Sequence, residues 1–343
     1  MRAALITGVA GTALAPREVA YLKEVRPAGL ILFARNLQSH AQIRALIDAV
    51  RDVVDSDELL VLIDQEGGRV QRLRPPLGRA LPPAAAFGRN FKRDPAGAAA
   101  AAFAVARLLA EDLKALGINT NCAPVVDLPG PGSHEIIGDR AYGREPAQVI
   151  ALAKAVGEGL MAGGVVPVIK HIPGHGRATA DSHLALPVVT ASRAELSTTD
   201  FLPFKALSAM PAAMTAHVVF RSIDPSEPAS TSAIVTREII RGEIGFDGLL
   251  MSDDLSMKAL SGDMRARARR VIAAGSDVAL HCNGDLSEVQ AAAAGVPALS
   301  GRAQQRFATA LAITTRSQPF DSAAAERHLG RLLNSAADGA ESV

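Results

Sequence analysis

The chain has 343 residues, of which 48% are hydrophobic and 21% are charged, a composition typical of a globular protein with a large buried core. Its 36 basic and 35 acidic residues give a formal net charge of +1, so no strong field attracts nucleic acid or an anionic membrane surface, and we expect neither as a partner. Only two cysteines are present, Cys122 and Cys282, which excludes a disulfide scaffold and favours a reducing, cytoplasmic location.

The N-terminal segment has two interpretations. Met1 and Arg2, followed by the largely apolar residues 3–15, loosely resemble a signal peptide. The apolar stretch is short, however, and Gly8 and Gly11 interrupt it. We therefore favour a first strand of the domain at residues 3–9. No apolar run in the sequence approaches the length of a membrane span.

Eight short apolar runs alternate with longer, helix-like segments along the chain. Most of the runs are apolar throughout, as expected of strands buried on both faces of a parallel sheet. The expected strands are residues 3–9, 28–33, 59–63, 118–122, 165–169, 212–217, 249–252 and 278–282. The expected helices are residues 16–25, 41–54, 98–116, 146–162, 200–209, 236–243 and 265–274. Eight β–α repeats predict an α/β fold, a single (β/α)8 barrel of the TIM type, and disfavour a doubly wound sheet.

Helix boundaries and domain limits agree with this fold. Asp94 and Pro95 open the longest expected helix, and Gly117 closes it. No linker or low-complexity tract divides the chain. We therefore expect one domain of residues 1–343, with a helical extension at about 284–334 that packs outside the barrel and a frayed tail at 335–343.

Polar and titratable residues gather where the expected strands end. In (β/α)8 barrels the chemistry takes place at this carboxyl-terminal end of the strands. The residues concerned are Asp64, Lys170, His171, His217, Asp253 and the segment 281–283. This clustering predicts an active site at one end of the barrel.

Asp253 directly follows an apolar strand and precedes a second acid, Asp254. A carboxylate at a strand end is held rigidly, which suits a nucleophile that attacks a sugar carbon. Alternatively, one of the two acids caps a following helix, since Asp is a common N-cap residue. We interpret Asp253 as the reacting carboxylate and Asp254 as structural.

The segment 170–183 holds a lysine, three histidines and an aspartate within fourteen residues. Proline and glycine residues interrupt it, so we expect a loop, which runs on to about residue 198; long loops in compact domains are usually functional. Asp181 lies two residues before His183, close enough in a turn to hold the imidazole ring and stabilise its protonated form. This predicts an Asp–His acid/base pair.

A metal site is the alternative for this loop, built from His171, His175, Asp181 and His183. Zinc signatures usually place their ligands on a helix or in paired knuckles, and this loop has neither. We therefore expect no metal and no other cofactor. A purely structural polar loop is the remaining alternative.

Residues 63–72 combine the strand-end carboxylate of Asp64 with further acids, arginines such as Arg72 and a glycine pair. Carboxylates and arginines suit hydroxyl-rich ligands, because they offer paired acceptors and forked donors. A phosphate loop is disfavoured, since the Walker pattern is absent and the acids would repel phosphate. The alternative is a salt-bridged loop.

Three further candidates have less context in the sequence. Arg140 is placed either to clamp a ligand or to pair with its neighbour Asp139, and Asp127 is placed to orient its neighbours. His217 either lines the site or is a satisfied core histidine.

Together these motifs resemble family 3 glycoside hydrolases, specifically the single-domain bacterial β-N-acetylglucosaminidases of peptidoglycan recycling. The resemblance covers nearly the whole chain, and the order and spacing of its motifs are highly specific. The segments that carry it are residues 29–33, 64–72, 170–176, 181–183, 214–217 and 245–257.

The resemblance implies a role for each matching residue. Asp253 corresponds to the nucleophile, His183 to an unusual histidine acid/base, and Asp181 to the residue that orients this histidine. The residues that correspond to the binding site of the terminal N-acetylglucosamine are Asp64, Arg72, Arg140, Lys170 and His171. His217 is a further candidate for this binding site. Ile172 stands where the family usually has Phe, and Ala141 where Ser is common.

The implied reaction is retaining hydrolysis through a covalent glycosyl intermediate on Asp253. The implied substrate is a small molecule, N-acetylglucosaminyl-anhydro-N-acetylmuramic acid with or without its peptide, and we expect the protein to be a monomer. The alternatives are a β-glucosidase or a phosphorylase of the same family, a metal-dependent hydrolase, and a non-catalytic sugar-binding protein on the same barrel.

Overall fold

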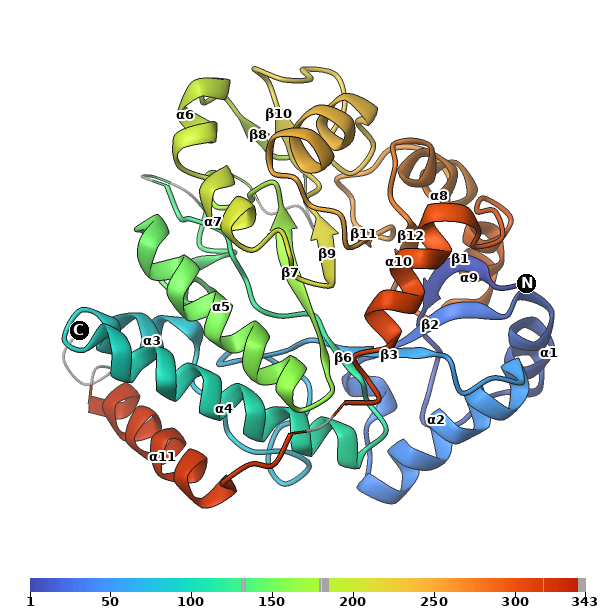
Figure 1. Cartoon of the computed structure of the whole chain (residues 1–343). Helices are drawn as coiled ribbons and strands as arrows, with labels where there is room; N and C mark the ends of the chain where they lie inside the picture. Colours follow the sequence, from blue (N-terminus) through green and yellow to red (C-terminus); the bar gives the residue numbers. More distant parts are fainter. Residues whose placement is uncertain (131, 133, 179, 181–184, 317, 339–343) are drawn as a thin grey trace.

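The computed structural model describes the chain except for residues 131, 133, 179, 181–184, 317 and 339–343. Eight parallel strands close a barrel in the order β1-β12-β11-β9-β7-β6-β3-β2. Their bounds are β1 Ala3–Thr7, β2 Pro27–Leu32, β3 Leu60–Ile63, β6 Thr120–Asn121, β7 Val166–Ile172, β9 Ala212–Thr215, β11 Leu249–Asp254 and β12 Val278–His281. Each expected apolar run supplies one strand, so the predicted (β/α)8 barrel is confirmed (Figure 1).

Helices surround this barrel. Those that the sequence predicted are α1 Pro16–Val25, α2 His40–Val54, α4 Pro95–Ala115, α5 Pro146–Ala162, α7 Phe201–Ala206, the π-helix η3 Val235–Glu243 and α8 Met264–Ala273. The sequence did not predict two short helices, α3 Ala84–Phe91 and α6 Arg193–Thr198. Two single 3-10 turns also precede the C-terminal region, η1 Ala34–Asn36 and η2 Gly138–Arg140. The carboxylate of Asp94 caps α4 by accepting from the Gly97 N–H at 2.9 Å, as expected.

The C-terminal region is helical as expected, with α9 Leu286–Ala293, α10 Gly301–Leu311 and α11 Ser322–Asp338. Helix α11 continues past the expected end at residue 334, so the expected frayed tail is wrong for residues 335–338, and residues 339–343 lie outside the described part of the chain. Helix α11 lies along α4 on the outside of the barrel (Figure 1). Helix α10 has a more specific position, because Phe307 and Ala310 belong to the same hydrophobic core cluster as barrel residues such as Ile6 and Val166. This helix therefore closes one end of the barrel, the end where Arg2 and the residues before β12 lie, and leaves the other end for the site.

The predicted long loop after β7 is only partly correct. Strand β7 continues through Lys170 and His171 to Ile172 before proline and glycine interrupt it. Farther on, β8 Val188–Val189 pairs in parallel with β10 Val219–Phe220, and α6 begins where Ser192 accepts a hydrogen bond from the Glu195 N–H. Regular structure thus returns once the glycines are passed, because a helix cap and β-branched residues are available there.

A second small sheet follows β3. Strands β4 Gln65–Gly67 and β5 Val70–Gln71 form an antiparallel hairpin, and its turn uses the positive φ angles of Gly67 (103°) and Gly68 (56°). The hairpin projects the side chain of Glu66 toward the site described below.

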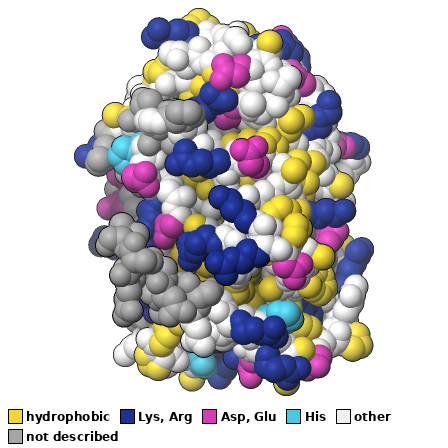
Figure 2. Space-filling model, turned by 90° about the vertical axis from the view of Figure 1, so that its left-hand side faces the viewer, with side chains coloured by type: hydrophobic (Ala, Val, Ile, Leu, Met, Phe, Trp, Pro, Cys, Tyr) yellow, Lys and Arg dark blue, Asp and Glu magenta, His cyan; other side chains and the backbone are white. Residues whose placement is uncertain are grey.

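The surface carries charges of both signs. On the face shown in Figure 2, Lys and Arg side chains lie among Asp and Glu side chains, in line with the formal net charge of +1. Among the helices of the described residues, none has the length and apolar character needed to cross a membrane.

Candidate active site

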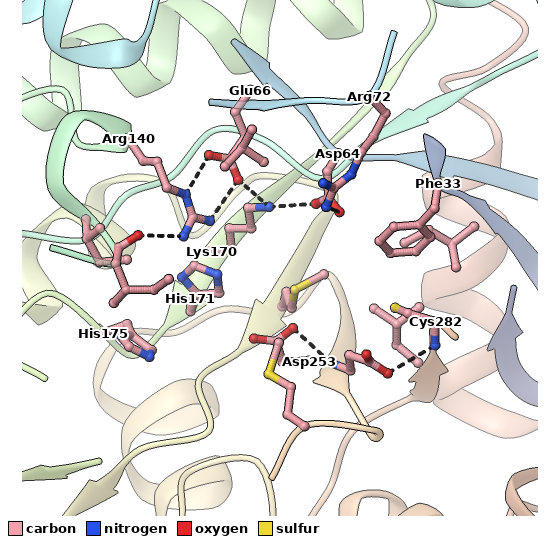
Figure 3. A pocket seen from close by; sticks show the side chains of 18 of the residues that line it. Phe33, Asp64, Glu66, Arg72, Arg140, Lys170, His171, His175, Asp253 and Cys282 are labelled. Carbon is pink, nitrogen blue, oxygen red and sulfur yellow. Dashed lines mark hydrogen bonds and ion pairs between the residues drawn. The ribbon is translucent and has the colours of Figure 1, made fainter. Parts of the chain in front are cut away.

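A cavity of about 260 Å³ opens at the carboxyl-terminal ends of the barrel strands (Figure 3). Its polar wall is formed by Asp64, Glu66, Arg69, Arg72, Arg140, Lys170, His171, His175, Asp253 and Asp254. Its apolar wall is formed by Ile31, Phe33, Val70, Ile136, Ile137, Met214, Met257, Leu280 and Cys282. The volume is below the range of about 300–1,000 Å³ typical of pockets for drug-sized ligands, so the cavity suits a ligand as small as one sugar unit.

Asp253 lies near the end of β11 and faces this cavity with only 7% of its surface exposed. Its Oδ1 accepts a hydrogen bond from the Asp254 N–H at 2.8 Å. Burial alone would raise the pKa of this carboxyl, but the neighbouring His171 and His217 and the backbone hydrogen bond outweigh burial and lower it. Asp253 is therefore held as a carboxylate at neutral pH.

The neighbouring acid, Asp254, is engaged by the protein. Its Oδ1 accepts from the N–H groups of Ser256 and Cys282, each at 3.0 Å, and its Oδ2 accepts from the Ser256 hydroxyl. No helix starts directly after it, because α8 begins at Met264 with Asp263 as its cap. The interpretation of these acids as helix caps is therefore wrong, and Asp254 has the structural contacts expected of it.

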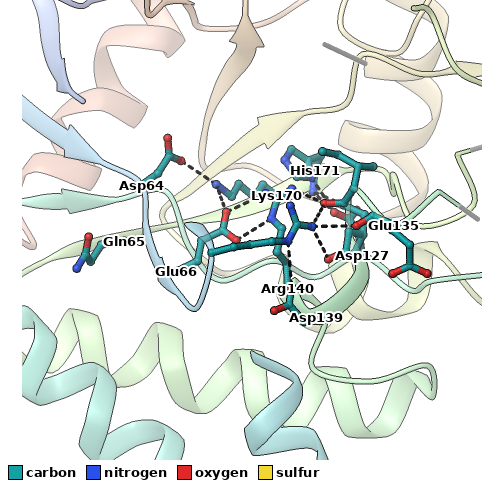
Figure 4. Close-up of polar contacts among 12 residues, drawn as sticks. Asp64, Gln65, Glu66, Asp127, Glu135, Asp139, Arg140, Lys170 and His171 are labelled. Atoms are coloured by element: carbon teal, nitrogen blue, oxygen red, sulfur yellow. Dashed lines mark hydrogen bonds and ion pairs between the residues drawn. The ribbon is translucent and has the colours of Figure 1, made fainter. Parts of the chain in front are cut away.

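Five charged side chains of alternating sign form what we call the charged row: Arg140, Glu66, Lys170, Asp64 and Arg72 (Figure 3). Figure 4 shows the first four of them from another side. Glu66 accepts two hydrogen bonds from Arg140, both at 2.8 Å, and contacts Lys170 Nζ at 2.7 Å. Lys170 Nζ also donates to Asp64 Oδ1 at 2.9 Å, and Arg72 donates to Asp64 Oδ2 at 3.0 Å. All five line the cavity.

The charged row stays ionised at neutral pH. Burial alone would raise the pKa of both carboxyls, but Lys170 and the adjacent arginines outweigh it, so the pKa of Glu66 falls to about 2 and that of Asp64 falls well below its usual range. Burial would lower the pKa of Lys170, yet Asp64 and Glu66 raise it. The row therefore presents fixed charges to a ligand.

Arg140 does not pair with its sequence neighbour. Asp139 instead forms an ion pair with Arg69 at 3.0 Å, with both side chains 44% exposed, whereas the Arg140–Glu66 pair is 10% and 7% exposed. The alternative that Arg140 pairs with Asp139 is therefore wrong. The guanidinium is directed into the cavity because the η2 turn carries it there.

His171 is held by a buried carboxylate. Asp127, fully buried, contacts His171 Nδ1 at 2.7 Å through Oδ2 and accepts the backbone N–H of His175 at 2.6 Å through Oδ1. A carboxylate on Nδ1 requires a proton there, which leaves Nε2 for other contacts. Asp127 thus orients its neighbours, as the sequence suggested. The ring of His175 lies 5.5 Å from that of His171, and burial first, then His171, lowers the pKa of His175 to about 4.

His217 does not form part of the cavity wall. It is fully buried, with Nδ1 2.7 Å from the Ser230 hydroxyl and Nε2 3.0 Å from the Asp254 carbonyl oxygen. Both ring nitrogens are thus used by the protein. The prediction that His217 binds substrate is not supported by this position, and the alternative of a satisfied core histidine describes it better.

Asp181 and His183 lie outside the described residues, so the predicted acid/base pair stays a prediction. The metal alternative involves the same two residues together with His171 and His175. Among the residues that the structure does describe, no group of three or more His, Cys, Asp and Glu side chains is arranged to hold a metal ion.

Glu66 and Phe33 are cavity residues with charged or cation–π contacts whose roles the sequence did not predict. Glu66 belongs to the 63–72 motif, but nothing local identifies it as the partner of Arg140, 74 positions away. The guanidinium groups of Arg72 and Arg35 lie over the ring of Phe33, at 4.9 and 5.1 Å from its centroid. This cation–π contact stabilises the position of Arg72. Phe33 could have been predicted from the sequence, because it is an aromatic residue at the end of an expected strand.

The fold and the acidic strand end define a class of enzyme. Residues 7–314 match the Glycosyl hydrolase family 3 N terminal domain. The chain is 42% identical over 283 residues to the β-hexosaminidase of Alkalilimnicola ehrlichii, a match that covers 81% of this chain and 80% of the relative. It is 39% identical to that of Bordetella avium with the same coverage. The chain therefore belongs to glycoside hydrolase family 3.

Solved structures of this family are similar over nearly the whole chain. NagZ from Neisseria gonorrhoeae, in complex with N-trifluoroacetyl-D-glucosamine, superimposes with a TM-score of 0.86 at 34% identity and covers 96% of this chain and 98% of its own. The family 3 β-N-acetylglucosaminidase of Paenibacillus sp. str. FPU-7 gives 0.84 at 30% identity, covering 97% and 67%. The predicted family is confirmed, and the chain is a glycoside hydrolase whose relatives are named β-hexosaminidases.

Proposed function

We propose that this enzyme is a retaining exo-β-N-acetylglucosaminidase. It removes terminal β-1,4-linked N-acetylglucosamine from N-acetylglucosaminyl-anhydro-N-acetylmuramic acid and its peptide-bearing forms, which derive from peptidoglycan. The names of the relatives and the glucosamine derivative bound to the Neisseria gonorrhoeae enzyme support this glycone. The observation that carries the proposal is the ionised, buried Asp253 that faces the charged row across a cavity of single-sugar size.

Asp253 acts as the nucleophile in this proposal. The backbone holds Oδ1, and among the described residues no hydrogen bond to Oδ2 is present, so this oxygen is free to attack. It bonds to the anomeric carbon while the bond from that carbon to the leaving oxygen breaks, which gives a covalent glycosyl ester. Water then displaces the carboxylate, and two displacements retain the configuration.

His183 acts as the acid and then as the base. It gives a proton to the leaving oxygen in the first step and takes one from water in the second, while Asp181 orients its ring. Imidazole has an unperturbed pKa of about 6.5, close to neutral pH, whereas a carboxylic acid would need burial to reach that value. A histidine is therefore a physically reasonable substitute for the usual carboxylic acid.

The charged row and His171 hold the terminal sugar. Asp64, with two oxygens and two cationic partners, offers acceptors to hydroxyl groups, while Arg72, Arg140 and Lys170 offer donors. The β4–β5 hairpin contributes Glu66 and Val70 to the wall of this cavity. A wall at this position fits an enzyme that accepts only the terminal unit of a chain.

The test is release of the chromophore from aryl β-N-acetylglucosaminides in phosphate-free buffer at neutral pH. We expect wild type to turn over and His183→Ala to lose roughly 10²- to 10⁴-fold in kcat/KM on substrates with poor leaving groups. With a good leaving group the loss in the first step should be small, because no proton is needed there. Asp253→Ala should be inactive with every leaving group.

Other results would point to the alternatives. Turnover only after phosphate is added would indicate a phosphorylase, since a histidine acid does not repel phosphate as a carboxylate would. Loss of activity with a chelator would indicate a metal-dependent hydrolase. Sugar binding without turnover would indicate a binding protein on this barrel.

We further propose that the enzyme acts in the cytoplasm as a monomer. Both cysteines are free and buried, which fits a reducing compartment. The described residues of a single chain bring Asp253 and the charged row to one cavity, which is what a monomeric enzyme requires.

A further inference from the structure

Glu66 is the carboxylate with the most protein contacts in the charged row. Its side chain is 7% exposed, Oε2 accepts from Arg140 Nε, and Oε1 accepts from Arg140 Nη2 and contacts Lys170 Nζ. Both oxygens are therefore committed to cations of the protein. Asp64 also contacts two cations, Lys170 and Arg72, but with one hydrogen bond to each oxygen, which leaves more of its acceptor capacity for a ligand.

The charges around the cavity balance only when Glu66 is included. The row contributes three cations, Arg72, Arg140 and Lys170, and two carboxylates, Asp64 and Glu66, and Asp253 faces them from β11. The two remaining charged residues of the wall, Arg69 and Asp254, have opposite signs, so the wall carries four cations and four carboxylates. Without Glu66 the same groups would carry an excess positive charge. Arg140 and Lys170 would also lose the carboxylate that lies between them, and like charges in a site with little solvent repel strongly.

The sign of this balance matters for glycoside hydrolysis. The transition state is oxocarbenium-like, so the sugar ring gains positive charge as the bond to the leaving oxygen breaks. An excess of fixed cations would oppose that charge, whereas a balanced cavity with an ionised Asp253 stabilises it. An enzyme that needs Arg140 and Lys170 as hydroxyl donors must therefore compensate their charge.

We propose that Glu66 is the positioning residue that performs this compensation. It holds Arg140 and Lys170 in place for the sugar hydroxyls and cancels one of their two charges, so that the site binds a cationic transition state better than the neutral sugar. This inference rests on the proposed function, because it assumes that an amino sugar occupies the cavity and that positive charge develops on it.

The test compares two ligands that differ in charge. N-acetylglucosamine is neutral, and a protonated imino-sugar analogue of N-acetylglucosamine carries the positive charge of the transition state. Titration calorimetry at neutral pH gives the dissociation constant of each for wild type and for Glu66→Gln, which keeps the shape of the side chain and removes its charge. We expect the imino sugar to lose roughly tenfold or more in affinity relative to N-acetylglucosamine.

Glu135→Gln is the matched control, because Glu135 is an exposed carboxylate on the loop that also carries Arg140. Its ratio of the two dissociation constants should stay that of wild type. Equal losses for both ligands in Glu66→Gln would overturn the proposal and leave Glu66 a merely structural residue. Failure of wild type to bind either ligand would instead contradict the proposed function.

Arg140→Gln provides the opposite change and keeps the proposal testable if Glu66→Gln does not fold. This variant lowers the charge of the cavity by one, so the ratio should shift toward the imino sugar, although both ligands bind more weakly. The double variant Glu66→Gln, Arg140→Gln should return the ratio close to that of wild type. A ratio that does not respond to either variant, with folding verified by thermal unfolding, would overturn the proposal.

Discussion

At the residue scale, the contact between Asp127 and His171 gives a test that is separate from the nucleophile. Burial would raise the pKa of Asp127, but His171 and His175 outweigh it and lower that pKa, so Asp127 acts as a fixed anion. In Asp127→Asn the amide can leave His171 in the other tautomer, with the Nδ1 proton moved to Nε2. We expect kcat/KM to fall roughly 10- to 100-fold, as for other residues that orient a functional histidine.

The measurement is kcat/KM as a function of pH on an aryl β-N-acetylglucosaminide. A change of the pH profile together with the loss would support an orienting role, because a general packing defect has no reason to move the profile. Asp48→Asn is the control, since that carboxylate is on a helix surface with 67% of its side chain exposed. An unchanged profile and rate in Asp127→Asn would show that His171 does not depend on Asp127.

The sequence predicts correctly those site residues whose role follows from their local context. It does not predict the contacts of residues whose partner is distant in the chain. Asp253 and Asp64 follow strands directly, and the structure brings both to the cavity. Arg140 was identified, but its partner Glu66 lies 74 positions away, and only the folded chain brings the two together. His217 has the position expected of a strand-end residue, yet its ring is directed to Ser230 rather than into the cavity.

At the element scale, helix α3 supports the loop that carries Arg140. Gln148 of α5 donates to the Gly88 carbonyl of α3 at 2.9 Å and to the Tyr142 carbonyl at 2.7 Å. Because a Cβ atom on Gly88 would overlap the Tyr142 carbonyl oxygen, Gly88→Ala should separate α3 from this loop. We expect a loss of about 1–3 kcal/mol in stability and a higher KM with a smaller change in kcat, measured by chemical unfolding and by kinetics.

Gly330→Ala is the matched control for this change. Gly330 lies in α11, a Cβ atom there would meet no atom within 4 Å, and alanine is the better helix former. Stability should therefore stay the same or rise, with kinetics unchanged. Wild-type KM in Gly88→Ala would mean that α3 does not control the position of Arg140.

The elements that the sequence predicted are those with a strong repeat pattern. All eight barrel strands were found, because most are apolar runs long enough to be seen between helices. The exception is β6, Thr120–Asn121, whose place follows from the glycine that ends the helix before it. Helix α3 was missed, since its eight residues contain a glycine and follow two prolines. The β4–β5 hairpin was also missed, because its strands have only three and two residues and are defined by their partner rather than by alternation.

At the scale of the whole molecule, the two ends of the barrel have different properties. Helix α10 closes one end with apolar side chains such as Phe307 and Ala310. The other end concentrates buried ionisable groups around the cavity, including the charged row. The groups around the cavity should therefore make the stability of this end depend on pH.

His175 offers a defined pH window for this dependence. Burial and His171 lower its pKa from 6.5 to about 4 in the folded protein, so the unfolded chain binds the proton first as the pH falls. The free energy of unfolding therefore decreases as the pH falls from about 6.5 to 4, and a pKa shift of this size corresponds to about 3 kcal/mol. For a chain of this length, a loss of that size corresponds to a decrease of about 4 °C in Tm.

The test is the variant His175→Asn, with Tm measured by calorimetry from pH 7 to 4. The Tm of the variant at pH 7 will differ from that of wild type. Between pH 7 and 4, however, the Tm of the variant should decrease by about 4 °C less than the Tm of wild type. Parallel curves for the two proteins would mean that His175 is not kept neutral by the fold, and that the acid sensitivity of this barrel end comes from its carboxylates alone.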